Sequence, residues 1–118
     1  MGTIRSVRRG EIWLVNFDPS LGHEIQKSRP AIIIQNDVGN AKSPLTVVVP
    51  LTSRNLDCEY PFELIIDKYN STLKQTSKAL FDQIRVIDKQ RLIQKKGVLL
   101  DEAILEMNTK IKYSLALP

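Results

Sequence analysis

The chain has 118 residues, of which 42% are hydrophobic and 25% are charged, a composition that indicates one globular domain over residues 1–118 and argues against disorder. Its net charge of +4 and pI near 9.3 favour anionic partners, nucleic acid among them. A single cysteine, Cys58, and a single histidine exclude an internal disulfide and a zinc site of the usual composition, so neither a metal nor another cofactor is expected. Because the chain has no apolar stretch of membrane-spanning length and no signal-peptide core at Met1–Ser6, we expect a cytoplasmic protein that contacts no membrane.

Short apolar runs rich in β-branched residues recur through the first three quarters of the chain. Each run has the length of a strand and is bounded by Pro, Gly, Asn, Asp or Ser. The runs are Glu11–Phe17, Ala31–Gln35, Thr46–Leu51, Phe62–Ile66, Lys78–Phe81 and Ile84–Ile87. Their regular spacing predicts a mainly β protein, built as a small barrel or a strongly curved sheet.

A long helix is predicted only from Asp101 onward, where the apolar period changes. The residues that fall on one helical face are Ile104, Met107, Ile111 and Leu115. Asp101 is the predicted N-cap, and acidic residues early with lysines late suit the helix dipole. We expect this helix to pack on the sheet. A shorter helical turn is expected over Lys89–Arg91, before a strand-like segment at Gly97–Leu99.

Two polar loops, Asp18–Ser28 and Ser53–Pro61, have room for a functional site. The first loop leads into Arg29, which precedes Pro30 and is therefore biased toward extended backbone at the start of a strand. The guanidinium group of an arginine matches the geometry of phosphate oxygens and stays charged at any working pH. The alternative interpretation is a solvated charge, or an ion pair with Glu24 or Glu11.

Two further segments carry polar side chains at the ends of apolar strands. Val47–Arg54 ends in Thr52, Ser53 and Arg54, which would form an anion site or, alternatively, merely begin a turn. Phe81–Lys89 places Gln83, with an acid and an arginine beside it, between two strands. Its side-chain amide would either read the edge of a base or hold a hairpin connection together.

Taken in order, these segments resemble the MazF/PemK (Kid) family of toxin endoribonucleases. Arg9–Trp13 is similar to the family's opening strand, and Gly22–Pro30 is similar to its G-x-E-x-x-x-x-R-P segment. Gln35–Asp37, Pro50–Thr52 and Asp82–Arg85 follow in family order. The resemblance covers nearly the whole chain and combines five motifs at family-like spacing.

The resemblance implies an SH3-like barrel of the CcdB/PemK type, with a C-terminal helix packed on the sheet, and a homodimer. It implies sequence-selective cleavage of single-stranded RNA without a metal. It also implies a cognate antitoxin whose disordered acidic tail occupies the RNA groove, for which a basic surface is suited. In the family an arginine and the threonine after the third strand form the catalytic pair, which correspond to Arg29 and Thr52.

Metal-free cleavage of RNA uses the 2′-hydroxyl as nucleophile and leaves a 2′,3′-cyclic phosphate and a 5′-hydroxyl end. Arg29 is the candidate that stabilises the charged phosphorane, and Thr52 the candidate that holds a phosphoryl oxygen. His23 is the only side chain with an ordinary pKa suited to proton transfer near neutrality, and so is a candidate acid or base. Its position is often Ser in the family, and the alternative is an exposed residue that only stacks on a base.

The RNA strand is expected to lie in a groove between the two loops. Lys27, which stands where many family members have Gly, and Arg54 would attract the RNA backbone, while Phe17 or Gln83 would contact bases. The full set of predicted substrate-binding residues is Phe17, Glu24, Lys27, Ser53, Arg54 and Gln83. Double-stranded RNA should resist cleavage because its bases are not accessible.

Two other interpretations of the sequence remain open. A CcdB-like toxin of the same fold would bind DNA gyrase through the C-terminal helix without cleaving RNA, and Arg29 and Thr52 would then be structural. A plain SH3-like binding module depends on an aromatic groove, which three Tyr, three Phe and one Trp scattered along the chain do not favour.

Overall fold

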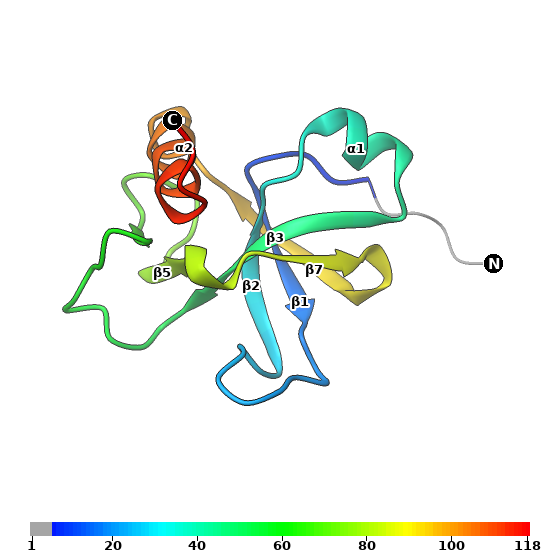
Figure 1. The fold of residues 1–118 in the computed structure, drawn as a ribbon, viewed down its shortest axis with the longest axis horizontal. Coiled ribbons are helices and arrows are strands. Elements are labelled where there is room, and N and C mark those ends of the chain that lie inside the picture. Colours follow the sequence, from blue (N-terminus) through cyan, green and yellow to red (C-terminus); the bar gives the residue numbers. More distant parts are fainter. Residues whose placement is uncertain (1–5) are drawn as a thin grey trace.

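Strands dominate the computed structural model, which describes residues 6–118 (Figure 1). Residues 1–5, which carry most of the segment assessed for a signal peptide, lie outside the described residues. The strands are β1 (Glu11–Asn16), β2 (Ser28–Ile33), β3 (Leu45–Thr52), β4 (Glu63–Ile66), β5 (Ser77–Leu80), β6 (Arg85–Asp88) and β7 (Leu92–Val98). The helices are α1 (Asp37–Lys42) and α2 (Asp101–Ser114), with short 3₁₀ turns η1 (Phe81–Gln83) and η2 (Lys89–Arg91).

The strands pair antiparallel in the order β4-β5-β3-β2-β1-β7, and β6 pairs separately with β3. Strand β3 is the centre of this arrangement because it pairs with β6 over residues 45–48, with β2 over residues 48–50 and with β5 at its last two residues. The predicted mainly β architecture with a C-terminal helix is confirmed. Among residues 6–118 no pairing joins β4 to β7, so closure of the sheet into a barrel stays a prediction.

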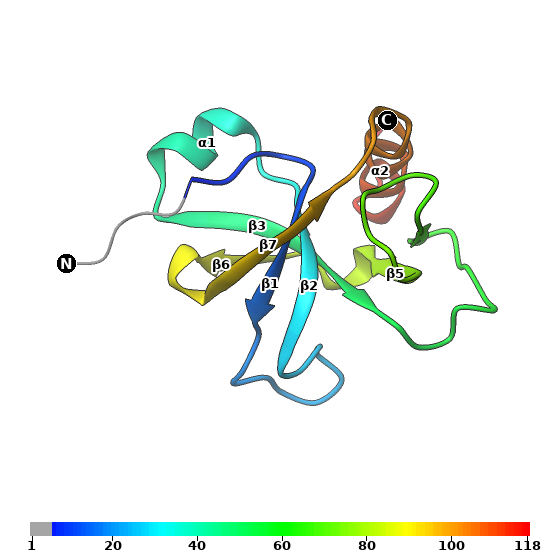
Figure 2. The same cartoon turned by 180° about the vertical axis from the view of Figure 1, so that it is seen from behind.

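The central strands are buried on both faces, and alternate residues therefore enter two separate apolar clusters. From β2, Ile32 packs into one cluster, whereas Ala31 and Ile33 pack into the other. The first cluster lies beneath α2, which covers one side of the sheet in both views (Figure 2). Ile32 and Ile33 have no exposed surface, and full burial of such a side chain contributes about 1.5–3 kcal/mol.

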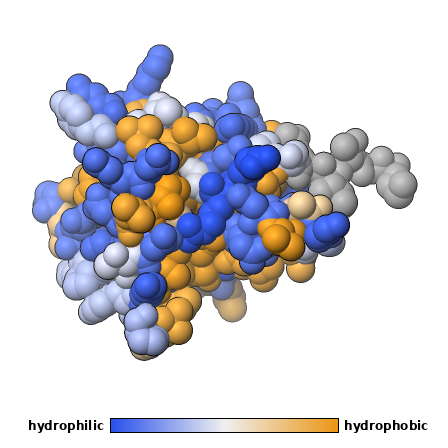
Figure 3. Space-filling view, turned by 90° about the horizontal axis from the view of Figure 1, so that it is seen from above, coloured by the Kyte–Doolittle hydropathy of each residue, from blue (hydrophilic) through white to orange (hydrophobic). Residues whose placement is uncertain are grey.

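Helix α2 packs on the sheet as predicted, with two details that differ. Leu100, not Asp101, is the N-cap, and Asp101 is the first helical residue, where its charge still suits the dipole. Met107 is buried, but Leu115 is 54% exposed because the helix ends at Ser114. Apolar patches interrupt the hydrophilic surface on the side of α2 (Figure 3). Within residues 6–118 no helix combines the length and apolar character that crossing a membrane requires.

Gly10 lets the start of β1 pass close under α2. Its φ is +92°, and an added Cβ would lie 2.6 Å from Cδ1 of Ile104. Only glycine meets both conditions without displacing a neighbour. This close approach accounts physically for the glycine in the Arg9–Trp13 motif.

Three boundaries or elements differ from the sequence prediction. Helix α1 was not predicted, because polar contacts hold it: the Asn36 side chain caps the backbone N–H of Gly39 at 2.8 Å. Strand β7 extends back to Leu92 through mostly exposed residues that lack an apolar period. Strand β2 begins at Ser28, so Pro30 is its third residue and not its first, since pairing with β1 already starts at Ser28 opposite Asn16.

Candidate active site

The site forms where β2 and β3 separate. The ladder between these strands pairs Ile33 with Val48, Ile32 with Val49 and Ala31 with Pro50, and is not continued beyond that pair. Pro30 on one strand and Pro50 on the other both lack a backbone N–H, which removes donors where the ladder ends. Strand β3 then turns to pair with β5, and a wedge opens between the two strand ends.

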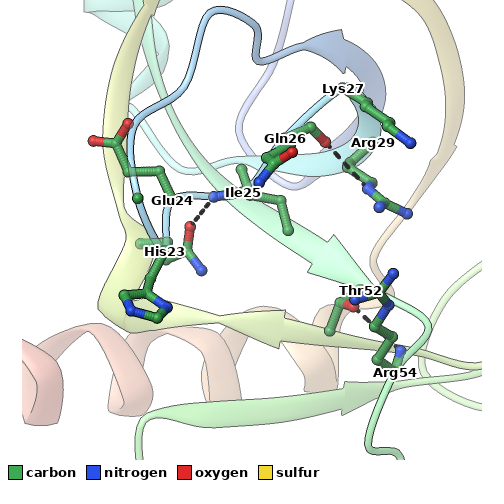
Figure 4. A pocket seen from close by; sticks show the side chains of 10 residues that line it. His23, Glu24, Ile25, Gln26, Lys27, Arg29, Thr52 and Arg54 are labelled. Carbon is green, nitrogen blue, oxygen red and sulfur yellow. Dashed lines mark hydrogen bonds between the residues drawn. The ribbon is translucent and has the colours of Figure 1, made fainter.

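A cavity of about 370 Å³ occupies this wedge (Figure 4). It is closed on one side by the loop after β1 and on the other by the end of β3. The lining residues are Gly22, His23, Glu24, Ile25, Gln26, Lys27, Arg29, Thr52, Arg54 and Gln83. Seven of these were predicted as site residues from the sequence, although the loops that carry them are far apart along the chain.

Arg29 and Thr52 come from opposite walls of the cavity. The register that pairs Ala31 with Pro50, continued by two residues, sets Arg29 across from Thr52 on the same face of the sheet. The Arg29 Nε donates to the carbonyl oxygen of Gln26 at 3.3 Å. The Thr52 hydroxyl accepts the backbone N–H of Arg54 at 3.2 Å, which is the local turn that the sequence left as an alternative. Both side chains nevertheless line one cavity.

The cavity carries an excess of positive charge. Lys27, Arg29 and Arg54 line it together with a single carboxylate, Glu24, whose Oε1 accepts the backbone N–H of Leu21 at 2.7 Å. Figure 4 shows Glu24 on the opposite side of the cavity from Arg29. Among residues 6–118 Arg29 forms no salt bridge, so the ion pair considered for it is not formed.

Glu11, the other carboxylate considered for Arg29, has different partners. Its carboxylate accepts hydrogen bonds from Trp13 Nε1 at 3.0 Å and from the backbone N–H of Arg8 at 2.9 Å, and it lies 3.0 Å from Lys95 Nζ. Partial burial raises the pKa of Glu11, but these bonds and the lysine charge outweigh it and hold the pKa below its usual value.

Two backbone contacts set the shape of the first loop. Lys27 has a φ of 64°, the left-handed conformation that glycine favours, and its N–H donates to Asp18 Oδ1 at 2.9 Å. This explains physically why glycine is suited to this position. The Gln83 Oε1 accepts the N–H of Ile25 at 2.6 Å, so the side chain that was predicted to read a base also fastens the loop.

Two predicted site residues do not line the cavity. Phe17 is fully buried in the second apolar cluster, with the guanidinium carbon of Arg85 at 5.5 Å from its ring centre, so the prediction that it contacts a base is wrong. Phe17 was predicted at the end of a strand, next to the loop, but its side chain points into the core and not toward the loop surface. Ser53 is exposed, but it is not among the residues that line this cavity.

A second hollow of about 530 Å³ adjoins the first. His23, Glu24 and Gln83 border both, so the two form one continuous surface. The other residues of the second hollow are Asp82, Ile84 and Arg85. The acid of Asp82, the amide of Gln83 and the guanidinium of Arg85 give this hollow both hydrogen-bond acceptors and donors. Among residues 6–118 no three His, Cys, Asp or Glu side chains are grouped as metal ligands.

A family model described as PemK-like, MazF-like toxin of type II toxin-antitoxin system matches residues 8–115. The chain belongs to this toxin family. It is 39% identical over 111 residues to an endoribonuclease MazF of Staphylococcus saprophyticus, a match that covers 94% of this chain and 92% of the relative. This chain is thus a homologue of an endoribonuclease, and the sequence-based assignment to the MazF/PemK toxins is confirmed.

Solved structures show the same fold. MazF of Deinococcus radiodurans matches with a TM-score of 0.81 and 25% identity, covering 96% of this chain and 99% of that one. An endoribonuclease from a mycobacterial species, solved in complex with its cognate antitoxin, matches with a TM-score of 0.75 and 19% identity, covering 96% of each chain. The MazF-like arrangement of an antiparallel sheet with a C-terminal helix is therefore that of the present chain.

Proposed function

We propose that this MazF-like toxin cleaves single-stranded RNA at selected sequences by a reaction that needs no metal ion. The observation that supports this proposal is the placement of Arg29 and Thr52 on opposite walls of one cavity that is lined by further cations. An arginine that forms no salt bridge within residues 6–118 is available to bind the phosphate group of a substrate. The family assignment favours this function over the gyrase-binding alternative.

The chemistry proceeds by attack of the RNA 2′-oxygen on the adjacent phosphorus. The bond from phosphorus to the 5′-oxygen breaks, the 2′ proton passes to a base, and the leaving 5′-oxygen takes up a proton. The products are a 2′,3′-cyclic phosphate and a 5′-hydroxyl end. Arg29 stabilises the negative charge that develops on the phosphorane. Thr52 holds a phosphoryl oxygen by a hydrogen bond that its hydroxyl group donates.

His23 is the candidate for proton transfer. It is exposed, and it borders both hollows, so it can reach a substrate that crosses from one to the other. A His23→Ala variant tests this role by its pH–rate profile. Loss of one limb of the profile supports acid or base catalysis, whereas an unchanged profile and rate remove His23 from the mechanism.

The remaining cavity residues bind the substrate. Lys27 and Arg54 attract the RNA backbone from the two loops, and Glu24 and Gln83 contact bases from the boundary between the hollows. Ser53, next to Thr52, contacts the RNA backbone where it leaves the cavity. Bases have to be unpaired to enter the hollows, so duplex RNA is a poor substrate.

A cognate antitoxin inhibits the enzyme by placing a disordered acidic segment over the same cations. The mycobacterial relative was solved with its cognate antitoxin, and a MazE–MazF structure of Deinococcus radiodurans matches with a TM-score of 0.73 and 25% identity, covering 97% of this chain and 99% of that one. The active form is a homodimer in which the RNA groove runs along the junction of the two subunits. An acidic peptide and RNA compete for one basic surface.

One experiment tests the proposed function directly. The purified protein is incubated with a long unpaired RNA in excess EDTA, and the ends of the fragments are mapped. Discrete cuts with 2′,3′-cyclic phosphate ends support the proposal, provided that an Arg29→Ala preparation leaves the RNA intact. Intact RNA together with inhibition of DNA gyrase would instead indicate the CcdB-like function.

A further inference from the structure

Lys78 is a lysine inside the protein, on the sheet next to the cavity. Its residue is only 3% exposed, and it lies in β5, the middle strand of the β3-β5-β4 unit. It pairs with Thr52 on one side and with Ile65 on the other, so the three side chains share one face of this unit. The next residue, Ala79, points to the opposite face and packs in the first apolar cluster.

Every proton of the buried ammonium group has an acceptor. The Lys78 Nζ lies 3.0 Å from Glu63 Oε1, 2.9 Å from the carbonyl oxygen of Asn55 and 3.0 Å from that of Cys58. An ammonium group has three N–H donors, and three acceptors are present. Two of them are backbone carbonyls of the loop 53–61, which begins at the edge of the cavity.

The same loop is fastened by two carboxylates. Glu63 Oε1, the partner of Lys78, also accepts the backbone N–H of Tyr60 at 3.0 Å. Glu59 Oε2 accepts the backbone N–H of Ile65 at 2.7 Å, on β4. The loop therefore folds over the outer face of β4 and β5 and buries the ion pair. Because an unpaired buried charge is very unfavourable, the loop and the ion pair have to form together.

We propose that Lys78, together with Glu63, is a positioning residue that fixes the loop 53–61 so that Thr52 and Arg54 face the RNA cavity. Thr52 is the strand partner of Lys78, and Arg54 is followed at once by Asn55, whose carbonyl binds the ammonium group. Lys78 is not among the residues that line the cavity, so the role proposed for it is to position other groups and not to contact substrate. This inference rests on the proposed function, since the consequence of positioning is measured as RNA cleavage.

A purely structural role is the competing explanation, and a double substitution separates the two. Lys78→Met leaves the carboxylate of Glu63 buried without a counter-charge and lowers the melting temperature. Lys78→Met/Glu63→Met removes both charges, and apolar replacement of a buried ion pair commonly restores stability. The double variant still lacks every side-chain contact to Asn55, Cys58 and Tyr60. Lys74→Met, at an exposed lysine in the same region, is the matched control.

Cleavage of an unpaired RNA is measured for the wild type and all three variants. If Lys78 positions the loop, the double variant regains most of the melting temperature, but its kcat stays about 10–100-fold below wild type, because small displacements of catalytic groups have effects of this size. KM changes less, because the cations of the first loop remain. A double variant that cleaves within about threefold of wild type would overturn the proposal, as would a single variant of undiminished kcat.

Limited trypsin digestion measures how readily the loop 53–61 opens, and this measurement does not depend on enzymatic activity. Arg54 is a trypsin site within the loop, and the rate of cleavage after it is followed by mass spectrometry. The double variant should be cut at least about tenfold faster than the wild type and Lys74→Met, because local opening exposes the bond. An unchanged rate in the double variant refutes the positioning role. If wild-type protein fails to cleave RNA, the proposed function fails, while the digestion still decides whether Lys78 holds the loop.

Discussion

The two loops that enclose the cavity are held in different ways. The loop 18–27 is fastened by neutral or exposed groups: the Gln83 side chain accepts the N–H of Ile25, Asp18 accepts that of Lys27, and the Ile25 side chain packs against the second apolar cluster. The loop 53–61 closes over the buried ammonium group of Lys78. A single hydrogen bond to a loop contributes about 1 kcal/mol. The buried ammonium group, by contrast, has to keep all its acceptors, because a buried charge without partners is very unfavourable. We therefore expect the first loop to adapt to substrate more readily than the second.

Arg29 lies between these loops, and its removal should have the largest effect. We expect Arg29→Ala to lower kcat by about 10²–10³-fold, since in the proposed mechanism it deletes the donor that faces the developing phosphorane charge. Stability should change little, because the only described hydrogen bond of this guanidinium is a long one to Gln26. The measurement is single-turnover cleavage of an unpaired RNA together with thermal unfolding.

Arg29→Lys refines the same prediction. It keeps the positive charge but loses the planar pair of donors, and should recover only part of the activity. Near-native cleavage by Arg29→Ala would show that Arg29 is not catalytic. The cavity between the two loops would then not be the active site.

A substitution at Gln83 tests the hydrogen bond that holds the first loop. Gln83→Leu fills a similar volume but leaves the backbone N–H of Ile25 without its acceptor. We expect a loss of about 1 kcal/mol in the free energy of unfolding and a roughly tenfold lower kcat/KM, carried mainly by KM because the proposed role of the first loop is to bind substrate. A defect confined to kcat would show that this loop is as rigid a wall as the second.

The contrast between the loops also separates what the sequence could predict from what it could not. Arg29 next to Pro30, and Thr52 after an apolar strand, are local patterns, and both residues line the one cavity. Lys78 was predicted only as part of a strand, because an alternating lysine ordinarily faces solvent; its burial depends on a loop that folds back from a distant position. Phe17 was predicted to contact a base, but it is buried in the second apolar cluster. Several strands that are distant in the sequence form this cluster, so its position could not be predicted from the residues around Phe17.

Helix α1 shows a third kind of limit. Its stability depends on a polar network in which Asn40 Oδ1 accepts from Thr46 and from Gln35, and such contacts leave no periodic signal in a sequence. The family motif Gln35–Asp37 marked the position but not the helix. Motifs thus pointed to residues that line one cavity, whereas burial of polar groups had to be read from the structure.

Glu11 is the first residue of β1 and lies at the end of the strand away from both loops. A substitution here tests the pH dependence of stability without changing either loop. Its lowered folded-state pKa means that the carboxylate stabilises the fold above its usual pKa of 4.5, and that this contribution is lost as pH falls through the lowered value. Glu11→Gln should reduce the free energy of unfolding by about 1 kcal/mol at pH 7 and by progressively less in acid. Chemical denaturation at several pH values measures this. A constant difference between the two proteins at all pH values would contradict the assignment.

Lys27→Gly should have the smallest effect and bears most directly on the adaptable loop. Lys27 has a φ of 64°, a conformation that costs a non-glycine residue roughly 1–2 kcal/mol, while glycine loses roughly 0.5–1 kcal/mol more backbone entropy on folding. The two terms partly cancel, so stability should change by less than about 1 kcal/mol. The variant also loses one cation from the cavity, and the salt dependence of RNA binding should become shallower by about one ion. Lys27→Ala is the control for charge: it should show the same salt dependence as Lys27→Gly with lower stability, and an equal stability of the two would mean that the left-handed backbone is not maintained by the loop.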